Sequence, residues 1–232
     1  MSNIHPTAII DDLAEIHPSS KISAFTIIKG KVKINKDCII GSHNTIGADA
    51  ATGEVKKLET SIVIEEGCQI GDGVVIQSGC TNSTKIGKNS KINHNCSIGH
   101  GVIIAENCSI GLNNSISGKS ILGNNVLSGP GCTFTNRSQV GNNVQIGIGS
   151  LVLHEIEDNS VVIGRPARNI VLENKFNKEL RKLLNDDSKS KPITSVPSKY
   201  KFLKNILKSI YQILPNFFKK YISNYLNNKR KK

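Results

Sequence analysis

The sequence predicts an all-β solenoid, a chain wound into regular coils of short parallel strands. Three observations lead to this fold class: an aliphatic residue returns at every sixth position, a small residue occupies the fifth position of most hexads, and glycine often follows the aliphatic residue. A six-residue period does not fit the 3.6-residue period of a packed helix. Three hexads would close a triangular coil of about 18 residues, and such coils stack at roughly 4.8 Å.

The hexads form two runs separated by irregular segments. The first run extends from Ile4 to Ile46, after which residues 47–63 lose the pattern but keep its phase. The second run begins at Ile64 and continues to Val152, with a slip of four residues within 78–85. We expect an excursion loop from one coil at 47–63 and a smaller one at 78–85. Such loops are typical sites of ligand or partner contact, and a tolerated insertion is the alternative for both.

The six cysteines share one position in the repeat. Each falls on the fifth residue of a hexad, where most other occupants are Ala, Ser, Thr or Val. The residues are Cys38, Cys68, Cys80, Cys96, Cys108 and Cys132. Because this position selects for small size, we predict six buried structural thiols rather than a redox or zinc set.

Charge and aromatic content divide the chain near residue 188. Residues 188–232 hold twelve Lys or Arg and no Asp or Glu, which leaves 18 basic and 18 acidic residues in the rest. We therefore predict a β-helix over residues 1–168, a capping helix at 169–187, a linker at 188–198 and a basic amphipathic helical tail at 199–232. A cap is expected because the last coil of a solenoid otherwise exposes its core and strand edges.

The tail has two interpretations. A basic amphipathic helix with aromatic residues suits peripheral association with an anionic membrane surface, and packing on the coil or on a partner subunit is the alternative. Nucleic-acid binding is disfavoured because no recognisable nucleic-acid module accompanies the charge. No apolar run approaches the length of a membrane span, and the polar start is unlike a secretory signal. We expect a cytoplasmic protein, held at the inner face of the cell membrane if the tail binds lipid.

A column of equivalent positions marks the candidate site. With three hexads per coil, His100 stacks with Ser78 before it and with Gly118, Asn136 and His154 after it. A histidine beside a glycine has open space and a bare backbone N–H next to it. This arrangement suits a general base with an oxyanion donor in acyl transfer.

His94 is the competing candidate because it occupies the same position of the preceding hexad. Its column has Asp72 one coil earlier, a possible orienting acid. One coil later it has Leu112, where a glycine would be expected. The column therefore favours His100 as the base and leaves His94 and Asp72 as secondary candidates.

Two stretches carry a resemblance to a known family. Residues 64–100 resemble the lipid A pathway acyltransferases, and residues 92–168 are similar to bacterial sugar O- and N-acetyltransferases. Both belong to the left-handed β-helix hexapeptide-repeat acyltransferases. The resemblance implies a left-handed parallel β-helix with C-terminal α-helices, assembled as a homotrimer with active sites in clefts between adjacent coils.

The resemblance also implies roles for individual residues. His100 would be the base and the Gly118 N–H the oxyanion donor. The donor would be acetyl-CoA, with a phosphate meeting Arg168, and no metal is expected. The residues implied in cofactor binding are Asn136, Gly164, Arg165, Pro166, Ala167 and Arg168. Many relatives have an acid or Asn beside the catalytic histidine, whereas His100 lies between two glycines. A carboxylate from the 47–63 loop or from the next subunit would have to orient its ring.

Four functions follow, in order of preference. The first is acetyl transfer from acetyl-CoA to a hydroxyl or amine of a sugar, in surface polysaccharide or nucleotide-sugar biosynthesis. The second is an acyl carrier protein-dependent acyltransferase of a lipid A type pathway. A zinc-binding β-helix and a non-catalytic β-helix are remote alternatives, since His94 and His100 have no third histidine to complete a zinc site.

Overall fold

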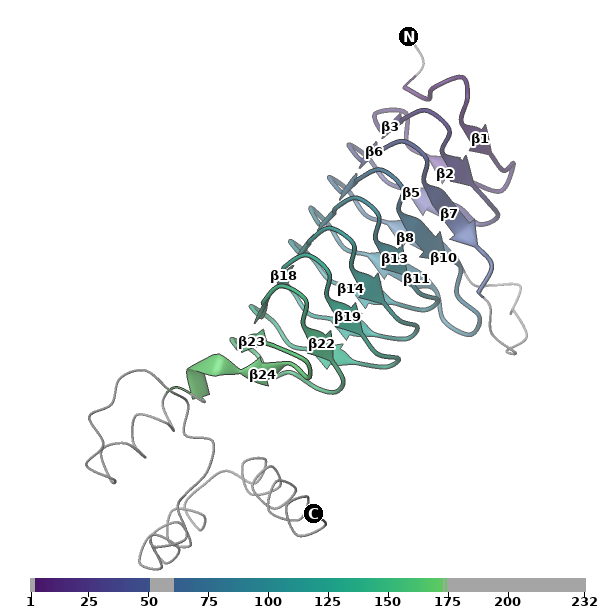
Figure 1. The fold of residues 1–232 in the computed structure, drawn as a ribbon. Coiled ribbons are helices and arrows are strands. Elements are labelled where there is room, and N and C mark those ends of the chain that lie inside the picture. Colours follow the sequence, from purple (N-terminus) through teal and green to yellow (C-terminus); the bar gives the residue numbers. More distant parts are fainter. Residues whose placement is uncertain (1–2, 51–60, 173, 175–232) are drawn as a thin grey trace, which may run out of the picture. The chain divides into compact units, whose positions relative to one another are not determined.

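The computed structural model describes residues 3–50, 61–172 and 174. These residues wind into parallel coils that stack along one axis, so that the strands form three sheets (Figure 1). Each strand is only two to four residues long, and each turn between strands is a corner of a triangular coil. The predicted all-β solenoid is confirmed.

The three sheets take every third strand in turn. Sheet I contains β1 (Ile9–Ile10), β4 (Ile27–Ile28), β7 (Thr45–Ala48), β10 (Val75–Gln77), β13 (Ser97–Ile98), β16 (Ser115–Ile116), β19 (Thr133–Phe134) and β22 (Leu151–Val152). Sheet II contains β2 (Glu15–Ile16), β5 (Val32–Ile34), β8 (Ile62–Ile64), β11 (Thr84–Ile86), β14 (Ile103–Ile104), β17 (Ile121–Leu122) and β20 (Gln139–Val140). Sheet III contains β3 (Lys21–Ile22), β6 (Ile39–Ile40), β9 (Gln69–Ile70), β12 (Lys91–Ile92), β15 (Ser109–Ile110), β18 (Leu127–Ser128), β21 (Gln145–Ile146), β23 (Val161–Ile163) and β24 (Arg168–Asn169).

We name the three edges of the prism by the sheets that they join. Edge 1 holds the turns from sheet I to sheet II, edge 2 those from sheet II to sheet III, and edge 3 those from sheet III back to sheet I. Residues 99–102, 117–120 and 135–138 are successive turns of edge 1. His94 lies in a turn of edge 3, so His94 and His100 occupy different edges.

The strand register shows where the two excursions fit. Ile98 pairs with Ile116 at the regular interval of 18 residues. Ile46 pairs with Ile76, an interval of 30, and Ile76 pairs with Ile98, an interval of 22. The excursions therefore add twelve and four residues to single coils. Both leave from edge 1, between β7 and β8 and between β10 and β11.

The core is built from the two inward positions of each hexad. The aliphatic residues of the second run from Ile64 onward are almost completely buried, including Phe134, which occupies one of these positions. All six cysteines are free and buried, as predicted. Several thiols donate to carbonyls of the next coil, such as Cys96 Sγ to Gly111 O at 3.0 Å and Cys132 Sγ to Gly147 O at 3.2 Å. Burial of each large aliphatic side chain contributes roughly 1.5–3 kcal/mol, which favours one register.

The last described coil ends in a hairpin. β23 and β24 pair antiparallel, with Ile163 opposite Arg168, and residues 170–172 and 174 are helical. The rest of the predicted capping helix (169–187), the linker (188–198) and the basic tail (199–232) lie outside the described residues. Within the described ranges, no helix has the length and apolar character needed to span a membrane.

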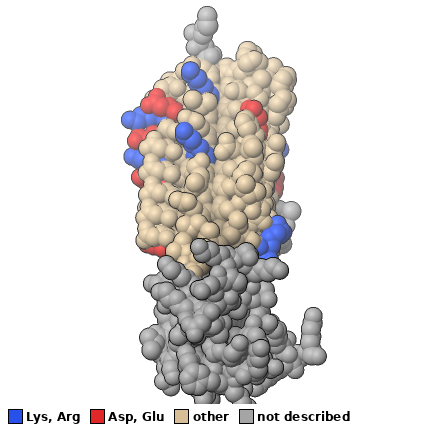
Figure 2. All heavy atoms as spheres, turned by 60° about the vertical axis from the view of Figure 1, so that its left-hand side comes forward, with Lys and Arg blue, Asp and Glu red and all other residues tan. Residues whose placement is uncertain are grey.

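Charged side chains are concentrated in the first coils. Figure 2 shows Lys and Arg interleaved with Asp and Glu near the N-terminal end and few charged side chains further along this face. On edge 2, Glu66 pairs with Lys36 at 3.5 Å and with Lys88 at 3.3 Å, which lowers the pKa of Glu66. The Glu66 carboxylate is therefore shared by two lysines from the coils on either side.

Candidate functional site

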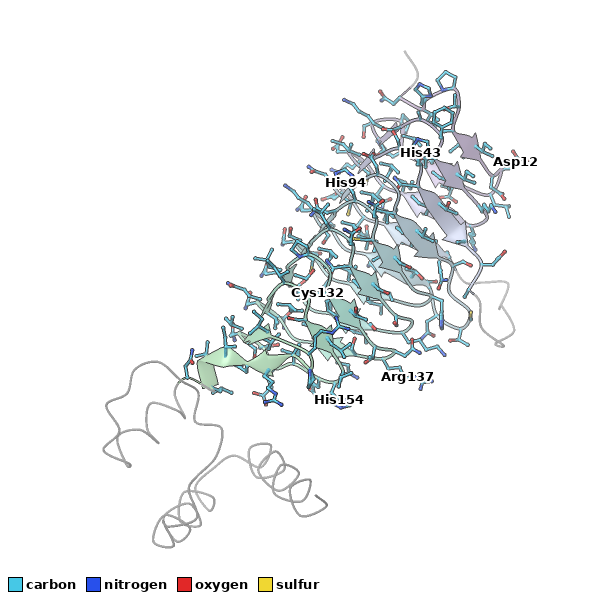
Figure 3. All side chains as sticks on the ribbon, viewed as in Figure 1. Asp12, His43, His94, Cys132, Arg137 and His154 are labelled. Atoms are coloured by element: carbon cyan, nitrogen blue, oxygen red, sulfur yellow. The ribbon has the colours of Figure 1, made fainter. Side chains whose placement is uncertain are left out.

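Edge 1 holds the column predicted from the sequence. His100 lies in the turn after β13, and Gly118 and Asn136 occupy the same place one and two coils later. Figure 3 shows His43 and His94 along one edge of the solenoid and Arg137 and His154 along another. Both excursions leave from the His100 edge.

The backbone of His100 is fixed by bonds to the coils on both sides. Its carbonyl accepts the Lys119 N–H at 2.8 Å, and the Gly99 N–H donates to Ile116 O at 2.8 Å. The Gly101 N–H donates to Thr84 Oγ1 at 2.9 Å. Thr84 is completely buried and donates in turn to Gln77 O at 2.9 Å. The sequence does not predict the contact of Thr84 with this turn, because the position of Thr84 depends on how residues 78–83 are arranged.

The imidazole of His100 lies over Gly118. A Cβ built on Gly118 would lie 2.6 Å from Cδ2 and 2.9 Å from Cε1 of the ring. His100 is half-buried, and its Nδ1 is buried with no hydrogen-bond partner among the described residues. Leaving a buried ring nitrogen without a hydrogen-bond partner lowers the stability of the folded state by about 1–3 kcal/mol. We therefore expect a group outside the described residues to bond Nδ1.

Elsewhere, a side chain caps the backbone N–H of the equivalent turn residue one coil earlier. Asp72 Oδ1 accepts the Ser42 N–H at 2.6 Å, and Asn124 Oδ1 accepts the Glu106 N–H at 3.0 Å. Asn142 and Asp158 continue this ladder on edge 2. In the described part of the chain, Asn136 makes no such bond to Gly118, and the Gly118 N–H donates no hydrogen bond. An uncapped N–H beside a histidine ring can stabilise a developing negative charge.

His94 belongs to the capping pattern. Its Nδ1 lies 2.8 Å from the backbone N of Asp72 and 3.2 Å from Asp72 Oδ2. An amide N–H can only donate, so Nδ1 of His94 is an acceptor, and the carboxylate is engaged instead by the Ser42 N–H. The neutral ring then carries its proton on Nε2, the outer nitrogen. In this tautomer the outer nitrogen of His94 cannot accept a proton, and Asp72 does not orient the ring through its carboxylate.

The segment 164–168 lies at edge 3. The Gly164 carbonyl accepts the Leu151 N–H at 2.9 Å, and the Ala167 N–H donates to Leu151 O at 2.8 Å. Arg165 Nη1 donates to Gly149 O at 3.3 Å, and Arg165–Pro166 is a cis peptide. Within one chain, Gly164, Arg165, Pro166 and Ala167 are therefore on a different edge from His100, Gly118 and Asn136, and Arg168 begins β24 of sheet III.

The described residues contain no group of three or more His, Cys, Asp or Glu side chains arranged to hold a metal ion. The chemistry available at edge 1 is that of an imidazole, a backbone N–H and nearby cationic side chains.

The sequence repeat and the fold can each be compared with known proteins. Residues 83–118 match the family model described as bacterial transferase hexapeptide (six repeats), and this match includes both His100 and Gly118. No curated protein sequence matches the chain significantly.

Several solved structures share the fold over most of their length. LpxA from Acinetobacter baumannii is 22% identical and superposes with a TM-score of 0.65, over 82% of this chain and 85% of that chain. The UDP-N-acetylglucosamine O-acyltransferase LpxA from Moraxella catarrhalis is 20% identical, with a TM-score of 0.64 over 90% and 92%. The UDP-N-acetylglucosamine acyltransferase LpxA from Bacteroides fragilis is also 20% identical, with a TM-score of 0.65 over 81% and 86%. The solenoid is therefore a left-handed parallel β-helix that carries hexapeptide repeats of the bacterial transferase type.

Proposed function

We propose that this protein is an acyltransferase in which His100 is the general base and the Gly118 N–H is the oxyanion donor. The observation that carries the proposal is the imidazole over Gly118, beside the uncapped Gly118 N–H. Of the two histidines in this region, His94 accepts the Asp72 N–H on Nδ1, whereas the His100 ring lies against Gly118.

The reaction balances without a metal. His100 Nε2 takes the proton of an acceptor hydroxyl or amine as its oxygen or nitrogen attacks the thioester carbonyl carbon. The new C–O or C–N bond leaves a tetrahedral oxyanion, which the Gly118 N–H stabilises. The C–S bond then breaks, and the imidazolium returns the proton to the leaving thiolate. Nδ1 must carry a hydrogen throughout this cycle. A carboxylate of the 47–63 loop or of a neighbouring subunit would accept the hydrogen bond that Nδ1 donates.

The preferred donor and acceptor are acetyl-CoA and a sugar. Gly164, Arg165, Pro166, Ala167 and Arg168 follow a pattern typical of acetyl-CoA users, and Asn136 lies on the His100 edge. Since 164–168 and His100 are on different edges, this proposal requires a second copy of the chain whose edge 3 faces edge 1 of the first. Exposed Leu112 and Ile148 give edge 3 an apolar surface suited to such a contact in a homotrimer.

The second candidate is transfer of a longer acyl group from acyl carrier protein. The similar solved structures named above are UDP-N-acetylglucosamine acyltransferases, which favours this candidate and a nucleotide-sugar acceptor in either case. We place either reaction in the cytoplasm, with residues 199–232 holding the enzyme at the inner face of the cell membrane.

The deciding experiment is a transfer assay with the purified full chain. Acetyl-CoA and acyl carrier protein thioesters are each offered with a panel of nucleotide sugars, and acylated product is detected by mass spectrometry. Product from acetyl-CoA supports the first candidate, and product from acyl carrier protein alone supports the second. His100→Ala should lower turnover on the order of 10²-fold or more while the folded fraction stays unchanged. Full activity of His100→Ala would refute the proposal.

A further inference from the structure

Two cations occupy adjacent coils of one column on the His100 edge. Between residues 92 and 164 the chain contains only two Lys or Arg residues, Lys119 and Arg137. They occupy edge 1 one and two coils beyond Gly101. The three turns 99–102, 117–120 and 135–138 contain no Asp or Glu.

Both cations sit at turn positions that disfavour them. Lys119 has φ 61° and Arg137 has φ 60°, in the left-handed region. Every other residue from 84 to 160 with positive φ is Asn or Gly: Asn89, Asn95, Gly101, Asn107, Asn113, Asn125, Gly131, Asn143, Gly149 and Asn159. Asn and Gly adopt this conformation readily, whereas long side chains do so at a cost. Phe25, Asp37 and His43 also adopt this conformation in the earlier coils, so the fold tolerates other side chains there at a cost in conformational energy.

Backbone hydrogen bonds place Lys119 beside the turn that holds His100 and Arg137 one coil further along the same edge. The Lys119 N–H donates to His100 O at 2.8 Å and the Arg137 N–H donates to Gly118 O at 3.0 Å, so the three turns are in register. Lys119 Cγ lies 3.6 Å from the position of a Cβ on Gly101, which places this side chain against the residue that follows His100. Arg137 is exposed on the same edge (Figure 3).

The spacing suits a phosphate group. Successive coils are about 4.8 Å apart, so the two cationic side chains leave the backbone from adjacent coils and can reach one dianion together. An Arg fork and a Lys ammonium are the usual partners of phosphate oxygens. The next residue of the column is Glu155, so the pair is bounded on that side by an acid. Gly118 and Asn136, which directly precede the two cations in the sequence, add no charge.

We infer that Lys119 and Arg137 form a binding pair for a phosphate or diphosphate group of the substrate that reacts at His100. The inference rests on the proposed acyl transfer for its location, and it adds a ligand group and two residues to that site. The phosphate belongs either to the thioester donor, as in CoA, or to a nucleotide-linked acceptor. The shared chemistry is a phosphate ester held about one or two coils from the reacting atoms.

The test uses the full-length chain with Lys119→Asn, Arg137→Asn and the double variant. Asn is the residue that the fold prefers at these turns, so the melting temperature should stay level or rise. Calorimetric titrations with CoA, with UDP and with pyrophosphate measure binding without turnover. We expect the double variant to bind at least one of the three ligands about tenfold or more weakly. Lys91→Gln, on the outer face of β12, removes one positive charge elsewhere and should change none of them.

Each arm has a distinct meaning. Weaker CoA binding with UDP binding unchanged identifies the donor phosphates, and the reverse result identifies the acceptor diphosphate. Wild-type protein that binds none of the three ligands, or a double variant that binds all three as wild type does, would overturn the inference. If turnover is found and the double variant leaves it and ligand binding unchanged, the acyltransferase proposal stands while this inference fails. If the wild type binds one of the ligands more tightly than the double variant but no donor gives turnover, this inference stands while the acyltransferase proposal fails.

Discussion

The His100 ring fills the space that a side chain at position 118 would need, because a Cβ on Gly118 would lie 2.6 Å from its Cδ2. Gly118→Ala should therefore displace the imidazole from the oxyanion donor. The backbone at 118 does not have positive φ, so alanine is conformationally acceptable and the clash is with the ring. We expect a fall in turnover of about 10²-fold or more, measured as kcat in the transfer assay.

A double-mutant cycle separates this clash from other effects of the methyl group. The stability cost of Gly118→Ala should be about 1–3 kcal/mol in wild type and should largely disappear in a His100→Ala background, where the ring is absent. Urea unfolding gives both values. An equal cost in the two backgrounds would show that the methyl group meets the backbone and not the imidazole.

Substitutions at His94 should affect stability and leave catalysis intact. His94→Ala removes the acceptor of the Asp72 N–H and should cost about 1 kcal/mol. His94→Asn should recover most of this loss, since Asn124 and Asn142 make the same contact in other coils. Turnover of both variants should stay within a few-fold of wild type. A large fall in kcat for the stable Asn variant would transfer the role of base to His94.

An apolar-to-charged change on edge 3 should reveal the assembly. Ile148 is 73% exposed and stands in the column of His94 and Leu112. If edge 3 meets edge 1 of another copy, Ile148→Glu buries a charge in the contact and should dissociate the oligomer. Light scattering coupled to size-exclusion chromatography gives the mass, and activity should fall with it. The matched variant Ile9→Glu changes an exposed residue of β1 and should keep the mass of wild type.

Stability should fall at alkaline pH. Burial raises the pKa of the Cys96, Cys108 and Cys132 thiols above 9.0. Above pH 9 the unfolded chain loses these protons while the folded chain retains them, so the unfolded state binds fewer protons and becomes favoured. The urea midpoint should therefore drop between pH 8 and pH 10. A variant with Ala at all three positions should show a smaller drop over the same interval, and an identical drop would assign it to other groups.

The sequence predicts most of the coil because each hexad repeats the same demand for one aliphatic and one small inward residue. Ile98, Ile116 and Phe134 follow one another at intervals of 18 and stack as expected. The interval from Ile46 to Ile64 is also 18, yet these residues lie on neighbouring sheets because twelve of the intervening residues form an excursion. An inserted loop of twelve residues has the same length as two hexads. The six-residue period therefore cannot show whether such a segment leaves the coil or forms two of its sides.

The site was predictable only to the level of a column. Gly118 and His100 could be stacked from their spacing, but the capping bond from the Asp72 N–H to His94 depends on a side-chain rotamer that no spacing specifies. Lys119 and Arg137 were missed because their unusual backbone angle is visible only in the structure. The separation of 164–168 from His100 likewise follows from which edge each turn occupies.

Both excursions leave from edge 1, and β7 still pairs with β10, with an irregularity after Ile76, and β8 with β11. A loop at this corner can thus be lengthened, shortened or exchanged without altering the strands that hold His100. In the proposed acyltransferase, the sheets would hold the reacting groups and the corner loops would contact the acceptor. Grafting a corner loop from another β-helix onto this chain should therefore change substrate choice without refolding the prism.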